Sequence, residues 1–279
     1  MEYIELKCVA KTDNPVSVEI LTAVLGDLGF ESFVEEDQTL LAYIPSDSFT
    51  PSLINNDQIT DFRKDFELSW NLIPDQNWNK VWEENFQPVT IDGKCHIRAP
   101  FHSSNKDVEY EIVIEPKMSF GTAHHETTAG MIQMILATEF KGKRVLDMGC
   151  GTGILAILAA MKGAGAVTAI DNDVWAYNNT LENTERNNTQ EINVLLGDAA
   201  LLGEQHFDII LANINRNILL SDIPVYSKCM YENGLLFLSG FYSEDLPAIK
   251  QMAGTSGLEY ISHLENNRWV AASFRKIKP

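Results

Sequence analysis

Long apolar runs and a leader segment are both missing from this 279-residue sequence. The densest apolar stretch, Ile154–Met161, is far shorter than the roughly 18 residues that a membrane-spanning helix requires. The chain begins Met-Glu-Tyr-Ile-Glu, which has neither the basic start nor the apolar core of a secretory signal. We therefore expect a cytoplasmic protein that makes no contact with a membrane.

Cysteine is scarce, and its spacing excludes the usual metal and disulfide frameworks. Cys8, Cys95, Cys150 and Cys229 are far apart and form no Cys-x-x-Cys pair. The six histidines likewise lack the His-x-x-x-His spacing of a helical metal site. We expect reduced structural thiols and no bound metal.

Basic residues are few as well. The chain has 21 lysines and arginines against 39 aspartates and glutamates, a formal net charge of −18. Such a surface repels phosphate, which argues against binding to nucleic acid or to an anionic membrane. A basic protein partner is compatible with it, and acidity that serves only solubility is the alternative. With 45% apolar residues, the chain has enough material for a sizeable core.

The first 70 residues predict a small α+β domain. Apolar residues alternate with polar ones in several short segments, as in β-strands, and they recur at helical spacing between Pro15 and Gly29. The resulting order, β-α-β-β-α-β, is that of a ferredoxin-like fold. The first 60 residues contain eleven acidic residues and two lysines, a net charge of −9 and half of the total. The predicted strands cover 3–9, 32–36, 39–44 and 66–70, and a second, weaker helix covers 52–64.

A polar connector follows this domain. Trp78, Trp82 and Phe86 recur every four residues, which places three aromatic side chains on one helix face; packing onto a neighbouring domain is the simplest interpretation. We therefore predict a ferredoxin-like domain over 1–72, a linker with a Trp-rich helix over 73–92, and a larger domain over 93–279.

From Lys143 onward, strands and helices alternate. This alternation predicts a mostly parallel sheet covered on both faces, with a final hairpin that adds an antiparallel strand. Short strands at 89–91, 96–101 and 110–115 precede it. The expected strands of the sheet are 144–148, 166–171, 192–196, 207–212, 235–239, 258–263 and 269–274.

A glycine-dense turn after the first strand of this sheet is the strongest chemical signal. Its glycines allow a sharp turn and the close approach of a ligand, and the following helix offers free N–H groups. Asp147, Gly149, Gly151 and Gly153 match Asp-x-Gly-x-Gly-x-Gly in full, the pattern typical of methyltransferases that use S-adenosylmethionine (SAM). The dinucleotide fingerprint fits only loosely, through Ala156. A carboxylate here neutralises the cationic amine of SAM and repels a pyrophosphate, so SAM is favoured over NAD.

Polar residues end the next three strands, where ligands of such sheets bind. Asp171 is placed to bind both ribose hydroxyls; helix capping is its alternative role, for which Asp173 is better placed. Asp198 is placed to accept from the adenine amino group, or is an ordinary loop aspartate. Asn213 lies beside the expected sulfonium, where its amide oxygen can accept from an attacking amine; without SAM it reads as a turn residue.

A polar loop containing His124 and His125 precedes the turn. Its position before the first strand predicts that it folds over the cofactor, whereas Thr127 or Thr128 can instead cap the following helix.

Together these motifs resemble the PrmA family of bacterial methyltransferases. The resemblance rests on Phe120-Gly121-Thr122, His125, Thr127-Thr128, the Asp147–Gly153 turn and Ala212-Asn213-Ile214, and it extends over essentially the whole chain. It implies a class I SAM-dependent methyltransferase fold, a seven-stranded doubly wound sheet, with an N-terminal domain that grips the substrate. It also implies methylation of lysines on the eleventh protein of the large ribosomal subunit, at the stalk base. Carried over by motif, SAM contacts fall on Thr128, Gly149, Asp171 and Asn213.

Two departures from the family pattern stand out. Ala123 and His124 replace a glycine and a threonine of the family loop, and Ala123 should stiffen it. Asn213-Ile214-Asn215-Arg216 lacks the Asn-Pro-Pro-Tyr of enzymes that methylate planar nitrogens, which favours an sp³ amine acceptor. We expect Asn213 to be the catalytic residue that aims this amine.

Other acceptors remain open at this stage. The alternatives are a SAM-dependent methyltransferase of another protein or of a small molecule, and a catalytically silent SAM-binding module. The expected partner is a basic ribosomal protein, free rather than ribosome-bound, and the enzyme is expected to be a monomer.

Overall fold

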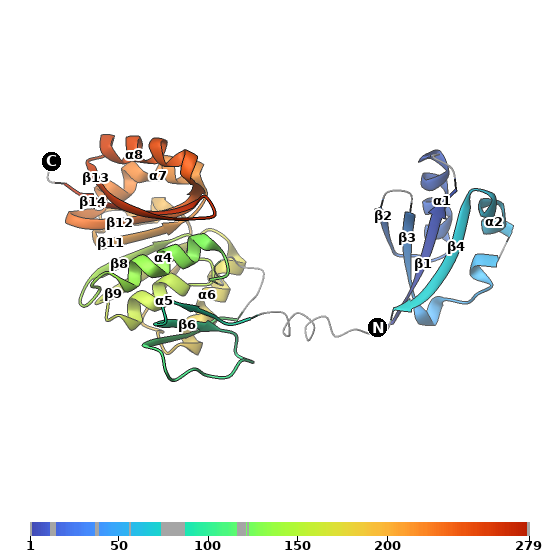
Figure 1. The fold of residues 1–279 in the computed structure, drawn as a ribbon, viewed down its shortest axis with the longest axis horizontal. Coiled ribbons are helices and arrows are strands. Elements are labelled where there is room, and N and C mark those ends of the chain that lie inside the picture. The colour runs from blue at the N-terminus through green and yellow to red at the C-terminus, as the bar shows by residue number, and fades with distance from the viewer. Residues whose placement is uncertain are drawn as a thin grey trace. The chain divides into compact units, whose positions relative to one another are not determined.

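The computed structural model describes residues 2–11, 15–36, 39–55, 57–73, 87–115, 121 and 123–277. The chain divides into two compact units, 1–85 and 86–279, each of which is described by itself (Figure 1). The division falls inside the predicted linker. The predicted helix around Trp78, Trp82 and Phe86 lies outside the described residues.

The first unit has the predicted ferredoxin-like arrangement. Its antiparallel sheet has the strand order β2-β3-β1-β4, so the two central strands are the first and third along the chain. The second predicted helix is reduced to one short α-helical turn, α2, between 3-10 turns. The elements are β1 (Tyr3–Ala10), α1 (Pro15–Asp27), β2 (Ser32–Glu36), β3 (Thr39–Pro45), α2 (Asp57–Thr60) and β4 (Phe66–Ile73).

Alternation along β1 builds the core of this unit. Ile4, Leu6 and Cys8 point to one face and are buried with Leu21 and Leu25 of α1. The opposite positions of the strand are not fully buried. One face of the sheet is therefore covered by helix, as the period of two in the sequence predicts.

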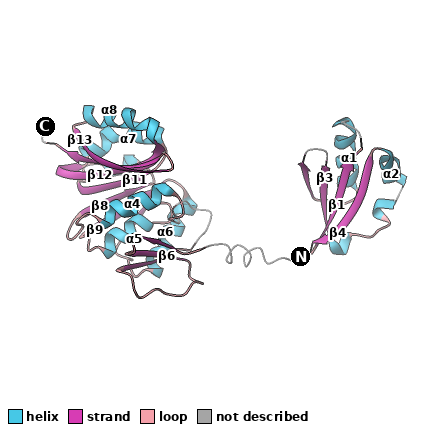
Figure 2. Cartoon of the chain, in the orientation of Figure 1, coloured by secondary structure: helices cyan, strands magenta, loops and turns pink. Residues whose placement is uncertain are grey.

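The second unit contains the seven-stranded sheet. Its order is β10-β9-β8-β11-β12-β14-β13, in which the first five strands are parallel and β14 is antiparallel to both of its neighbours, β12 and β13 (Figure 2). Chain order reverses between β8 and β11, and ligands of such sheets bind at this kind of switch point. The strands are β8 (Arg144–Met148), β9 (Ala166–Asp171), β10 (Asn193–Leu196), β11 (Phe207–Asn213), β12 (Met230–Tyr242), β13 (Leu258–Asn266) and β14 (Trp269–Lys276).

Helices cover both faces of this sheet. Alternate strand residues pack with α4 and α5 on one face and with α7 and α8 on the other, which explains why β8 is buried at Val145, Leu146, Asp147 and Met148 in succession. The helices are α4 (Glu126–Leu136), α5 (Ile154–Met161), α6 (Val174–Arg186), α7 (Arg216–Lys228) and α8 (Leu246–Thr255).

Two features differ from the sequence prediction. Strand β12 begins at Met230, five residues before the predicted start at 235, because Met230 already pairs with Phe207 of β11. The short strands β5 (Val89–Ile91), β6 (Cys95–Arg98) and β7 (Tyr110–Val113) form a three-stranded sheet of their own.

The larger unit consequently begins before the predicted boundary at residue 93, since β5 is part of it.

All four cysteines are buried and free, Cys8 in the first unit and the others in the second. Among the described residues, no helix is long and apolar enough to cross a membrane.

Candidate active site

A cleft of about 490 Å³ opens where the parallel strands end. Residues from the carboxyl ends of β8, β9 and β11 line it, as does the start of α6. The side chains His125 and Trp269 reach it from α4 and β14, which lie far apart in the sequence. The cleft therefore lies at the switch point that the strand order predicts.

The glycine-rich turn forms one wall of this cleft. Gly149 and Gly151 both line it and have positive φ angles of 71° and 58°. A Cβ atom on Gly149 would lie 2.1 Å from Ile214 Cγ2, so only glycine fits without displacing the residue that follows Asn213. Gly153 lies behind the turn, where it begins α5 in a left-handed conformation and does not line the cleft.

Asp147 lies under this turn and is fully buried. Its Oδ2 accepts a hydrogen bond from the Ala156 N–H at 3.0 Å, whereas Oδ1 is buried without a partner. Burial raises the pKa of Asp147 to about 7, and the nearby Asp171 carboxylate adds to the effect. A buried carboxylate with an unused oxygen is suited to a cationic ligand, although Asp147 itself does not line the cleft.

Asp171 lines the cleft at the end of β9. Its Oδ2 accepts from the Gly151 N–H at 2.9 Å and its Oδ1 from the Asp173 N–H at 3.0 Å. Each carboxylate oxygen keeps a further lone pair for a ligand hydroxyl. Capping of α6 falls to Asp173, whose Oδ1 accepts from Trp175 and Ala176, so the two aspartates divide the roles as the sequence predicts.

Asn213 ends β11 on the other side of the turn. Its Nδ2 donates to Thr128 Oγ1 at 3.3 Å, and its Oδ1 is buried without a partner. Thr128 is fully buried behind Asn213 and does not line the cleft; its neighbour Thr127 does. The structure thus brings Thr128 to Asn213. That Thr128 contacts SAM stays a prediction.

Comparisons with known proteins give this arrangement a family. The family described as "Ribosomal protein L11 methyltransferase (PrmA)" matches residues 9–277. Proteins named "Ribosomal protein L11 methyltransferase" from Bacteroides thetaiotaomicron and Phocaeicola vulgatus are 46% and 45% identical, over 98% of this chain and 99% of theirs. The chain belongs to the PrmA family. It is therefore a SAM-dependent methyltransferase, and the resemblance drawn from its motifs is confirmed.

A solved relative supports the PrmA fold. The crystal structure of the "ribosomal protein L11 methylase" from Lactobacillus delbrueckii subsp. bulgaricus matches with a TM-score of 0.64 at 27% identity. The match covers 69% of this chain and all of that one. The predicted class I methyltransferase fold is confirmed.

Asp198 lies outside the lining of this cleft. In this PrmA chain it is exposed, and its Oδ1 accepts from the Ala200 N–H at 2.9 Å to cap a 3-10 turn. This contact is that of an ordinary loop aspartate, the alternative role. That Asp198 accepts from the adenine amino group stays a prediction.

The far wall of the cleft joins His125, from the loop that the sequence places over the cofactor, to Trp269, which the sequence prediction missed. His125 and Trp269 meet there with ring centroids 4.6 Å apart, and Tyr242 packs on Trp269 at 4.0 Å. His125 also caps α4, with Nδ1 accepting from the Thr127 N–H, where the sequence suggested a threonine. The topology could have indicated Trp269. A strand that runs antiparallel to its neighbours begins at the edge of the sheet where the parallel strands end, and Trp269 is the first residue of such a strand.

The loop before α4 has one strained position. Ala123 is buried at a φ of +67°, a conformation that favours the glycine of the PrmA family pattern. His124 Nε2 lies 2.8 Å from the Gln87 carbonyl oxygen, so its side chain holds this loop to residues before β5. No group of three His, Cys, Asp or Glu side chains in the described ranges is placed to hold a metal ion.

Proposed function

We propose that this protein transfers methyl groups from SAM to lysine amines of ribosomal protein L11. One observation carries the choice of an amine: Asn213 lines the cleft beside the glycine-rich turn, and its Oδ1 is a buried acceptor without a partner. A buried acceptor that is left unpaired costs free energy, so a donor such as an amine N–H is expected to satisfy it.

The residues of the cleft fit SAM. When bound, SAM supplies a methyl group activated by a cationic sulfonium. The Gly149 and Gly151 backbone would hold it closely, Asp171 would accept from the ribose hydroxyls, and Asp147 would offset its positive charge. Neither lysine nor arginine lines the cleft, so the electrostatics of its described residues favour a cationic ligand.

The acceptor amine has to be neutral to react. A free lysine has a pKa of about 10.4, so at pH 7 roughly one molecule in 2,500 is neutral. Burial in a cleft next to a cation lowers that pKa, because both desolvation and like charge oppose the ammonium. Asn213 Oδ1 would then accept an amine N–H and aim the nitrogen lone pair into the cleft, while the proton leaves to water. The rings of His125 and Trp269 would pack against the alkyl chain of the substrate lysine.

The test is to find the methylated residue. The full-length enzyme is incubated with methyl-labelled SAM and purified L11, and peptide mapping locates the label. A second basic ribosomal protein and intact large subunits serve as parallel substrates. Label on lysines of free L11 is the expected result. Label on a non-lysine residue would overturn the choice of amine, and no label on L11 would overturn the choice of substrate.

We further propose that the acidic first unit docks L11, which would favour the free protein over the RNA-rich ribosome. Charge complementarity supports this, since the first 60 residues, all within this unit, hold half of the net charge of −18. Replacing exposed Asp27 and Glu35 by Asn and Gln should raise the KM for L11 about threefold at low salt. The control replaces exposed Glu232 and Glu259 of the second unit by Gln and should leave KM unchanged.

Added salt should abolish the difference between the two pairs, because it screens surface charges. Equal effects of the two pairs would contradict docking on the first unit. A monomer in the cytoplasm fits this proposal, and sedimentation of the purified enzyme tests the monomer.

A further inference from the structure

Helix α6 and the residue that caps its C-terminus carry three asparagines at a spacing of four residues, and all three are buried. Asn179, Asn183 and Asn187 have exposed fractions of 1%, 0% and 8%. Buried amides need partners, and a spacing of four places them in one row along the helix. This row faces the segment 113–115, at the end of β7.

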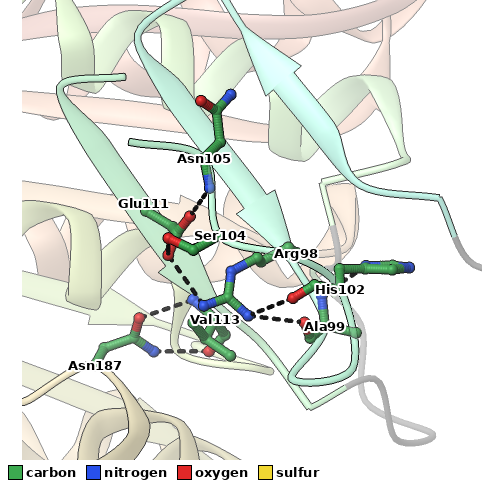
Figure 3. Close-up of polar contacts among 8 residues, drawn as sticks. All are labelled: Arg98, Ala99, His102, Ser104, Asn105, Glu111, Val113 and Asn187. Carbon is green, nitrogen blue, oxygen red and sulfur yellow. Dashed lines mark hydrogen bonds and ion pairs between the residues drawn. The ribbon is translucent and has the colours of Figure 1, made fainter. Parts of the chain in front are cut away.

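The row pairs with the outer backbone edge of that segment. Asn187 accepts from the Val113 N–H at 2.8 Å and donates to its carbonyl at 2.7 Å (Figure 3). Asn183 Oδ1 accepts from the Glu115 N–H at 2.9 Å, and Asn179 Nδ2 lies 3.4 Å from the Glu115 carbonyl. The residue between them faces the other way, with the Ile114 N–H donating to the Arg98 carbonyl of β6.

The two periodicities match. Four residues of helix rise about 6 Å, and two residues of strand rise about 6.6 Å. Asn187 and Asn183, four residues apart on the helix side, can therefore bind Val113 and Glu115, two residues apart on the strand side. One consequence is structural, since the row covers an otherwise open strand edge.

Asn183, unlike Asn187, also hydrogen-bonds to the glycine-rich turn. Its Nδ2 donates to the Thr152 carbonyl at 2.9 Å, inside the glycine-rich turn, and Thr152 Oγ1 donates to the Gly121 carbonyl at 2.7 Å. Gly121 has a φ of +107°, and a Cβ there would lie 2.8 Å from Thr152 Oγ1, so the contact is close. A continuous chain of hydrogen bonds thus runs from Glu115 through Asn183 and Thr152 to Gly121.

We propose that Asn183 is a positioning residue for methyl transfer. Through Thr152 and Gly121, Asn183 fixes the position of the glycine-rich turn relative to His125 and Thr127, which line the other side of the cleft. Asn183 itself does not line the cleft, so it acts through Thr152 rather than on a ligand. The expected loss of turnover in Asn183 variants rests on the proposed methyl transfer, whereas the expected change in the position of the glycine-rich turn does not.

The matched control is Asn187→Ala. Asn187 caps the C-terminus of the same helix, is also buried and binds the same segment, but within the described residues it has no bond to the turn. Asn183→Ala and Asn187→Ala should therefore lower thermal stability by similar amounts. Only Asn183→Ala should reduce kcat/KM for SAM, by about tenfold, because misplaced reacting groups lose rate steeply.

Thr152→Val gives a second route to the same answer, since it is nearly isosteric and keeps the Thr152 carbonyl. If the chain acts as one unit, Asn183→Ala and Thr152→Val together should cost little more in kcat/KM than either alone. The combination of Asn187→Ala with Thr152→Val should instead show no coupling. Independent effects of Asn183 and Thr152 would overturn the proposal, as would equal kinetic losses in the two asparagine variants.

A readout without turnover separates this inference from the proposed function. S-adenosylhomocysteine should slow amide hydrogen exchange at Ile114, whose N–H donates to the Arg98 carbonyl and keeps this partner in both variants, in the wild type and in Asn187→Ala. In Asn183→Ala this protection should be lost while the ligand still binds. Protection that persists in Asn183→Ala would overturn the positioning role, even if no label is transferred to L11.

Discussion

The two walls of the cleft are built in different ways. The wall formed by Gly149 and Gly151 is made of backbone, and its shape follows from positive φ angles within a few residues. The facing wall is made of the side chains His125, Asn213 and Trp269, from three elements far apart in the sequence. The first wall suits the binding of a cofactor common to many enzymes. The second is free to vary and is expected to fix the acceptor and its alignment.

The largest expected effect comes from filling the backbone wall. Gly149→Ala adds a Cβ 2.1 Å from Ile214 Cγ2 at a φ of +71°, so the free energy of unfolding should fall by about 3 kcal/mol, and binding of S-adenosylhomocysteine should be lost. Gly93→Ala is the control: its φ is +65°, but nothing lies within 4 Å. It should cost only about 1 kcal/mol and keep binding.

Urea unfolding and titration calorimetry measure these two quantities. Full binding by Gly149→Ala would show that the backbone wall is not where the cofactor binds.

Next comes removal of the acceptor from the side-chain wall. Asn213→Ala should lower kcat about 100-fold, because the amine is no longer aimed, while affinity for S-adenosylhomocysteine changes little. Single-turnover kinetics with L11 and calorimetry with the ligand separate the two effects. Equal losses in turnover and affinity would instead make Asn213 a cofactor-binding residue.

A smaller loss of turnover is expected from substitution of Thr128, which lies behind Asn213. Thr128→Val keeps the shape but removes the oxygen to which Asn213 Nδ2 donates at 3.3 Å. Turnover should fall about tenfold with ligand affinity unchanged, since Thr128 acts through Asn213. The same two assays apply, and a fall in affinity would support the direct contact with SAM that the family motif implies.

The smallest effect concerns pH and the charge under the backbone wall. Folding raises the pKa of Asp147 from 3.8 to about 7, so its protonated form stabilises the fold below the lower value, and that contribution is lost as pH rises through about 7. A cation in the cleft favours the ionised form. SAM affinity should therefore increase about threefold from pH 6 to 8, with release of a proton.

Calorimetry in buffers of different ionisation enthalpy detects that proton. Asp147→Asn keeps an acceptor for the Ala156 N–H and should remove the pH dependence. If the dependence persists in Asp147→Asn, Asp147 is not the group that releases the proton.

The comparison of the walls also explains what the sequence could predict. The turn from Asp147 to Gly153 is contiguous, so its role is visible in a short motif, and the strand order places Asp171 and Asn213 at the same edge. Trp269 was missed because its position depends on pairing between β12 and β14. Asp198 also follows a strand, but its Oδ1 accepts from the nearby Ala200 N–H, so position after a strand does not distinguish a ligand contact from a local cap.

The fold follows the same rule. The strands and helices after Lys143 have clear periodicity and are found close to their predicted ranges. The helix predicted over 52–64 is broken into short turns, because its sequence has no sustained apolar face to hold one long helix on the sheet. The β5-β6-β7 sheet depends on pairing of segments too short to reveal their partners.

The buried thiols allow local opening of each unit to be measured by their alkylation. Burial raises the pKa of Cys8 and Cys95 to about 12, and alkylating reagents react with the thiolate, so labelling requires local opening. Cys8 then records opening of the acidic unit, and Cys150, inside the glycine-rich turn, records opening of the catalytic one. Mass spectrometry of alkylation over time can therefore follow the two units separately in the unmodified chain, and a cofactor analogue should protect Cys150 alone of this pair.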